Sequence, residues 1–172
     1  MPAHCNNGMV SSSVKRVLLS NSNFNRHPTY RQQVAQLVEA AFERDKLPGE
    51  SRRNYLRAFL HSRGGHHLLV VREGSDEVIA HYNGIPASNP AGRKSAFIGH
   101  LIVKSGTSGG IAIYKPLNEH LAGLGFTEVR GSHYSTAGSR LGAMIRCTVL
   151  GVTRRGKQFQ KPELTYYKRA LR

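Results

Sequence analysis

The chain has 172 residues, enough for one domain with a hydrophobic core of ordinary size, and 39% of them are hydrophobic. Twenty-five Lys and Arg against ten Asp and Glu give a formal net charge of +15, which favours polyanions or acidic protein surfaces as partners. No apolar stretch is long enough to cross a membrane, and the two cysteines make no disulfide framework. We therefore expect a cytoplasmic protein with no membrane partner.

The first part of the chain predicts a short tail, a strand and a helix. Residues 1–13 are polar and small and are expected to be a disordered tail, with a single domain over residues 14–172. Residues 14–19 are predicted to be a strand, and the Ser/Asn-rich residues 20–25 a turn. Residues 30–44 are predicted to be a helix, because apolar residues recur at helical spacing: Val34, Leu37, Val38, Ala41 and Phe42.

A second helix and a hairpin are predicted next. Ser51 is suited to cap a helix over residues 51–63, after the break at Pro48-Gly49. Residues 67–72 and 77–82 are predicted to be two antiparallel strands joined by a four-residue turn.

The adjacent residues His66 and His67 invite a metal-site interpretation. Neighbours on a strand point to opposite faces of the sheet, so these two imidazoles would not share a metal ion. We therefore assign them structural roles and expect no metal site. Residues 85–94 contain two prolines and a glycine and are predicted to be a loop.

The stretch from residue 97 to residue 124 organises the rest of the chain. Residues 97–103 are an apolar, β-branched run that predicts a buried central strand, and the glycine-rich residues 104–110 follow it. A helical period then continues through Ile113, Leu117, Leu121 and Leu124. A strand, a glycine-rich loop and a helix N-terminus together make an anion site suited to a pyrophosphate.

Pro116 supports a different interpretation of the same stretch. A proline inside a helix costs about 3 kcal/mol relative to alanine, so the helix could begin at this proline instead. Residues 111–115 would then be a second strand, and residues 105–110 a hairpin turn. The local residues support both interpretations equally.

The C-terminal part predicts a strand, a helix and a hairpin. Residues 127–132 are predicted to be a strand and residues 139–150 a helix with Leu141 and Met144 on one side. Residues 152–159 and 164–169 are predicted to be the two strands of a terminal hairpin.

In this order of elements the chain resembles the GNAT N-acetyltransferases over about residues 14–171. That family's acetyl-coenzyme A loop follows the fourth strand with a Q/R-x-x-G-x-G/A pattern. Gly110 and Ala112 match the end of this pattern, whereas Thr107 replaces the usual Gln or Arg and the loop is one residue short. The resemblance implies an α/β (α+β) fold: a mixed, mostly antiparallel sheet of six or seven strands, with helices on both faces. The sheet would be parallel only where the strands 97–103 and 127–132 diverge.

The resemblance also implies a cofactor site. Leu101-x-Val103 fits the family's strand whose backbone pairs with the pantetheine arm of acetyl-CoA, and Leu150-Gly151-Val152 fits the L-G-F that follows the last helix. The residues implied to hold acetyl-CoA are Leu101, Val103, Thr107, Ser108, Gly109, Gly110, Ile111 and Ala112.

Acetyl transfer to an amine needs an acid for the leaving thiolate and a base for the amine. Cys147 occupies the position, counted back from Leu150, where many family members carry a tyrosine acid, and Tyr134 is the second candidate by its chemistry. His133 and His100 are the imidazoles available as a base. Each imidazole is as consistent with a structural role as with a catalytic one, and for Cys147 plain packing is the favoured interpretation.

Two classes of function follow. The first is an acetyl-CoA-dependent N-acetyltransferase acting on an amine of an acidic macromolecule, with a protein amine favoured over an aminoacyl-tRNA or other RNA. The alternative is a basic nucleic-acid-binding or inhibitory protein-binding module with a GNAT-like fold and no turnover. A homodimer is one expected assembly, because two-fold dimers are the commonest.

Overall fold

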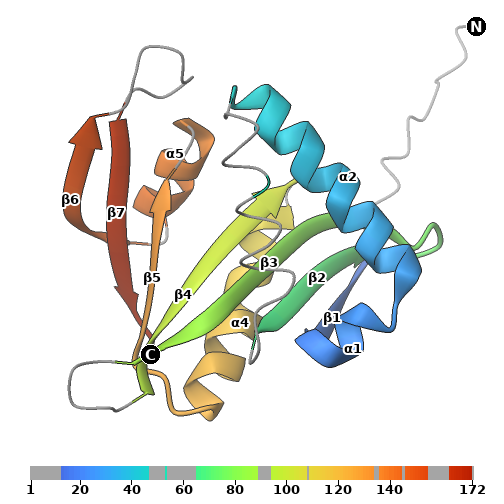
Figure 1. Cartoon of the computed structure of the whole chain (residues 1–172), viewed down its shortest axis with the longest axis horizontal. Helices are drawn as coiled ribbons and strands as arrows, with labels where there is room; N and C mark the ends of the chain where they lie inside the picture. Colours follow the sequence, from blue (N-terminus) through green and yellow to red (C-terminus); the bar gives the residue numbers. More distant parts are fainter. Residues whose placement is uncertain are drawn as a thin grey trace, which may run out of the picture.

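The computed structural model describes residues 13–46, 53, 65–88, 94–107, 109–133, 136–144, 146–154 and 163–171 (Figure 1). One seven-stranded sheet runs through it in the order β1-β2-β3-β4-β5-β7-β6. Every neighbouring pair is antiparallel except β4 and β5, which are parallel. The predicted sheet is confirmed. Its strands are β1 (Val14–Ser20), β2 (His66–Arg72), β3 (Glu77–Ser88), β4 (Lys94–Val103), β5 (Glu128–His133), β6 (Thr148–Arg154) and β7 (Glu163–Ala170).

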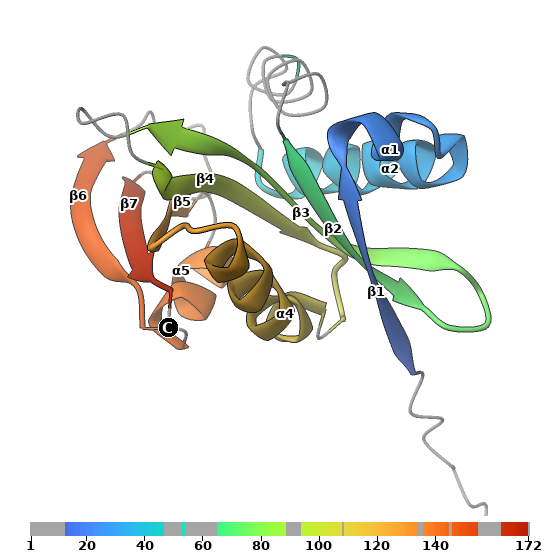
Figure 2. The ribbon, with the colours of Figure 1, turned by 90° about the horizontal axis from the view of Figure 1, so that it is seen from below.

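Helices cover both faces of the sheet (Figure 2). The helices α1 (Asn21–Asn25) and α2 (Pro28–Arg44) lie on one face, and α4 (Gly109–Gly123) and α5 (Thr136–Met144) lie on the other. None of the helices in the described part of the chain is both long and apolar enough to cross a membrane.

Strand alternation divides the core into two clusters. Leu68 and Val70 of β2 pack with α4, whereas Leu69 and Val71 face α1 and α2, because successive strand residues point to opposite faces. The five apolar residues predicted for the first long helix are all buried in the α1–α2 cluster: Val34, Leu37, Val38, Ala41 and Phe42. On the other face, Ile113, Leu117 and Leu121 of α4 are buried, while Leu124 lies past the helix end and is 42% exposed.

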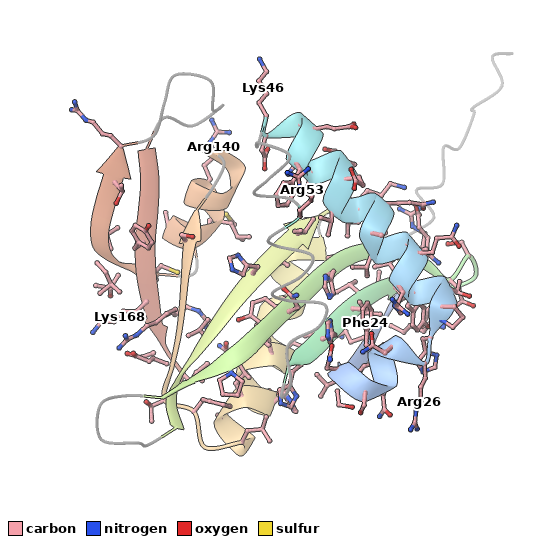
Figure 3. All side chains as sticks on the ribbon, in the orientation of Figure 1. Phe24, Arg26, Lys46, Arg53, Arg140 and Lys168 are labelled. Atoms are coloured by element: carbon pink, nitrogen blue, oxygen red, sulfur yellow. The ribbon has the colours of Figure 1, made fainter. Side chains whose placement is uncertain are left out.

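The two adjacent histidines point to opposite faces, as predicted. Nδ1 of His66 lies 3.5 Å from Nε2 of His120 on α4. His67 is fully buried on the other face, where its ring stacks on Phe24 of α1 at a centroid distance of 4.1 Å (Phe24 is labelled in Figure 3).

His67 is part of a buried polar chain. Its Nε2 donates to Asn21 Oδ1 over 3.1 Å, so its Nδ1 accepts from Nε2 of His81 over 3.0 Å. His81 on β3 is also fully buried. Burial lowers the pKa of His67 to about 4 and lowers that of His81 well below its usual value. Both rings are therefore neutral at pH 7.

Several sequence-based boundaries were wrong. Residues 20–25 form a short helix rather than a turn, because Ser20 Oγ accepts from the Asn23 N–H and caps it. The predicted loop over residues 85–94 is shorter, because β3 continues to Ser88 and β4 begins at Lys94. Pro86 is tolerated in β3 because the pairing with β2 begins at Gly84, so no described residue of β2 pairs with the proline.

The helix predicted over residues 139–150 instead covers Thr136–Met144 and is followed by β6. Arg146 adopts a positive φ of 56°, and the Cys147 N–H donates to Gly142 O over 2.9 Å, which ends the helix. Apolar spacing extended the prediction too far, because Thr148 and Val149 are β-branched and pair with β7.

Some predicted segments fall outside the described residues. These are the second helix over 51–63, apart from residue 53, the tail over 1–12, and residues 155–159 of the predicted terminal hairpin. At residue 13 the carbonyl of Ser13 accepts from the Glu73 N–H over 2.9 Å. The terminal hairpin is confirmed as the antiparallel pair β6–β7, although β6 begins four residues earlier than predicted.

Candidate functional site

The parallel strands β4 and β5 diverge along their length (Figure 1). Only three residue pairs join them among the described residues: Ala96 with Glu128, Phe97 with Val129, and Ile98 with Arg130. Beyond Ile98, β4 keeps its other neighbour, because β3 pairs with it as far as Val103. The edge of β4 over residues 99–103 therefore faces the gap toward β5. Its backbone can pair with an extended amide-containing ligand.

A tight turn follows this open strand segment. Thr107 donates from its N–H and from Oγ1 to the Lys104 carbonyl oxygen, over 3.3 and 2.8 Å. Gly106 has a φ of 74°, a conformation that a glycine adopts without strain. These contacts end β4 and direct the chain into α4.

Helix α4 begins at Gly109 and continues through Pro116 to Gly123. The glycine-loop interpretation is thus correct, and the alternative strand over residues 111–115 is wrong. Packing of Ile113, Leu117 and Leu121 into the core offsets the cost of the proline. The first turn of α4 holds Gly109, Gly110, Ile111 and Ala112, whose backbone N–H groups have no partner within the helix and carry the positive end of its dipole. This turn can bind an anion.

The structure thus brings the predicted cofactor residues to one end of β4. Leu101 and Val103 are in the open strand segment, Thr107 is in the turn, and the four residues of the first helical turn follow. Ser108 lies outside the described residues. The sequence signal for this arrangement was the apolar run followed by glycines.

His100 lies within this open segment of β4, on the opposite face from Leu101. It shares its face with Ile102, which packs in the α1–α2 cluster. The side chain is half-buried, and burial lowers its pKa to about 4. At pH 7 the imidazole is neutral, the form that can accept a proton.

Cys147 lies after the end of α5 rather than on the helix, contrary to the prediction. It is half-buried, and burial raises the pKa of its thiol, an effect that the nearby Arg169 partly opposes. The thiol is therefore protonated near neutral pH. Cys147 precedes β6, which is separated from β4 by β7 and β5 in the sheet order. His133 ends β5, at the gap, while Tyr134 and the His133 side chain lie outside the described part.

One residue that sequence reasoning missed lies at this end of β4. Arg44 is the last residue of α2, and its Nη1 lies 3.4 Å from both the Val103 carbonyl oxygen and Ser105 Oγ. Some sixty residues separate Arg44 from this turn in the sequence, so no local pattern could reveal the contact.

Solved structures of acetyltransferases share this fold. An aminoglycoside 6'-acetyltransferase type Ii superposes with a TM-score of 0.67 at 12% identity, covering 92% of this chain and 97% of its own. A putative acetyltransferase from Salmonella typhimurium, with its cofactor acetyl-CoA, gives 0.59 at 15% identity over 92% and 94%. A GNAT-family acetyltransferase from Streptococcus pneumoniae gives 0.59 at 12% identity over 93% and 100%.

No family model matches this sequence, and no curated protein does. The similarity is therefore one of structure. The chain has the fold of the GNAT N-acetyltransferases.

Proposed function

We propose that this protein is an acetyl-CoA-dependent N-acetyltransferase. The observation that carries the proposal is the open edge of β4 leading directly into a turn and a helix N-terminus. The open strand edge can pair with an extended amide arm, and the helix N-terminus can bind a pyrophosphate. The cofactor present in a neighbour of the same fold supports the same assignment.

The proposed chemistry is direct transfer. The amine must be neutral to attack the thioester carbonyl, and neutral His100 is the proposed base, accepting the amine proton directly or through water. As the tetrahedral intermediate collapses, the C–S bond breaks and the thiolate of coenzyme A needs a proton. Cys147, protonated near neutral pH, and Tyr134 remain the proposed acids, and His133 is the second proposed base.

The acceptor is proposed to be an amine of an acidic macromolecule, a protein rather than an RNA. The net charge of +15 supports this choice. Lys46 projects at the end of the molecule toward which β4 and β5 run (Figure 3). An aminoglycoside, the substrate in the name of one neighbour, is polycationic, and a strongly basic protein would repel it.

The cofactor proposal is tested with Gly110→Asp and a thermal-shift titration with acetyl-CoA. The added carboxylate would lie at the positive helix end where phosphates approach, so binding should be lost. The wild type should gain about 2.7 kcal/mol of stability at a hundredfold excess of ligand over Kd. Gly123→Asp at the other end of α4, where an added Cβ meets nothing within 4 Å, is the matched control. A folded Gly110→Asp variant with unchanged affinity would contradict the site.

The acceptor proposal is tested by measuring acetylation of acidic and basic peptides at low and high salt. The kcat/KM for acidic peptides should exceed that for basic ones and should fall as salt screens the attraction. Equal rates on both peptide sets would exclude charge as the basis of selection. RNA binding with a steep salt dependence, and no response to acetyl-CoA, would favour the nucleic-acid-binding alternative.

A further inference from the structure

The guanidinium of Arg44 is held in a fixed orientation beside the turn that follows β4. Its Nε and Nη2 donate to the two carboxylate oxygens of Asp45, over 3.0 and 3.3 Å. Asp45 is only 6% exposed, so its carboxylate is a fixed acceptor. The one nitrogen that Asp45 does not engage, Nη1, is turned toward the β4 end and the turn. A carboxylate that accepts two hydrogen bonds from one edge of a guanidinium orients the other edge for a second anion.

The contacts of Nη1 leave it able to bind a better acceptor. Both of its distances, to Val103 O and to Ser105 Oγ, are 3.4 Å, beyond the usual range for N–H···O bonds. A phosphate oxygen would accept a shorter, charge-assisted bond from the same nitrogen. Arg44 also remains partly open to solvent, with 39% of its side chain exposed.

The turn has no comparable cation of its own among its described residues. Lys104 is its one basic side chain, and Lys104 forms an ion pair with Glu77. The hydroxyl of Thr107 donates to the Lys104 carbonyl oxygen within the turn. A pyrophosphate at this turn would therefore meet backbone N–H groups but would need its cation from another element.

We propose that Arg44 supplies this cation: it steadies the turn through Val103 and Ser105 and donates from Nη1 to a phosphate of the acetyl donor. This inference rests on the proposed function, because the anion is the phosphate of acetyl-CoA. It makes α2, which covers the opposite face of the sheet from α4, a second contributor to the cofactor site.

The test compares two acetyl donors, acetyl-CoA and S-acetylpantetheine, because the second lacks the phosphates. Arg44→Met should raise the KM for acetyl-CoA about tenfold, the value of one charge-assisted hydrogen bond. The kcat/KM for S-acetylpantetheine should stay within about twofold, because no phosphate is present to lose a contact. Arg44→Lys keeps the positive charge but not the planar guanidinium. Its KM for acetyl-CoA should fall between those of the wild type and Arg44→Met.

Arg31→Met is the matched control, because it removes an exposed arginine from the first turn of the same helix. It should change neither KM. Equal losses with both donors in Arg44→Met would mean a structural role and would overturn the proposal, as would an unchanged KM for acetyl-CoA. If Arg44→Met does not fold, an Arg44→Lys variant with wild-type discrimination between the donors would overturn it as well.

The two proposals fail in distinguishable ways. A wild-type protein that binds neither acetyl-CoA nor coenzyme A would overturn the proposed function and this inference together. A wild type that binds coenzyme A, with Arg44→Met binding it equally well, would overturn the role of Arg44 alone.

Discussion

The sheet differs on the two sides of the gap between β4 and β5. On the first side, β2 and β3 are buried between α1 and α2 on one face and α4 on the other. On the second side, β6 is an edge strand whose residues are mostly exposed, including Val149, Leu150 and Val152 at 60, 52 and 53%. The difference indicates that stability comes mainly from the first side, which also holds the turn and α4. The exposed apolar residues of β6 could contact a second copy of the chain. The homodimer expected from the sequence stays a prediction.

The largest expected effect on stability comes from truncating one leucine on each side of the gap and comparing the two losses. Leu121→Ala empties a fully buried position on α4 and should lower the free energy of unfolding by about 2–5 kcal/mol. Leu150→Ala on β6 should change it by less than about 0.5 kcal/mol. Urea denaturation measures both. A cost for Leu150→Ala similar to that for Leu121→Ala would mean that another surface, such as a second copy, covers β6 in solution.

The buried histidines of the first side predict an acid-sensitive stability. The folded-state pKa values of His67 and His81 lie below the unfolded value of about 6.5, so the unfolded chain binds protons that the folded chain does not. The stability that the two rings contribute is complete above that pH and declines as the pH falls below it. The slope should approach about 1.4 kcal/mol per pH unit for each ring.

Urea denaturation between pH 7.5 and 5.0 measures this slope, in a range above the titration of most carboxylates. The double variant His67→Phe, His81→Phe should remove their share of the slope and leave the share of His100, whose pKa is also lowered to about 4. The added rings are placed to stack on Phe24. His27→Gln, at the N-cap of α2, serves as the control. A slope unchanged in the double variant would show that these two rings do not account for the acid sensitivity.

The smallest effect comes from the two helix ends. Both α4 and α5 end with paired backbone bonds around a residue of positive φ, Gly125 at 86° and Arg146 at 56°. Gly125→Ala should destabilise the protein by about 1 kcal/mol, through backbone strain alone, because an added Cβ meets nothing within 4 Å. Arg146→Gly should stabilise it by up to about 1 kcal/mol. Melting temperatures that shift in the same direction would contradict this explanation.

The sequence predicted the elements whose residues carry their own periodic pattern. Apolar spacing identified the buried face of α2, because burial on one side of a helix forces a regular pattern. Continuous apolar runs identified β2 and β4, because a strand that is covered on both faces, as β2 is, needs apolar residues on both. The opposite orientation of His66 and His67 followed from strand geometry alone. The glycine-rich turn and the resemblance to a family indicated which end of β4 would form the site.

Tertiary structure decided what local residues left open. Pro116 made a helix and a strand equally plausible locally, and packing of Ile113, Leu117 and Leu121 against the sheet selected the helix. Thr148 and Val149 continued a helical pattern, but pairing with β7 made them a strand. The contact of Arg44 with the turn after β4 exists only because α2 and β4 end at the same place. Such contacts join residues far apart in the chain, and only the packing of the elements brings them together.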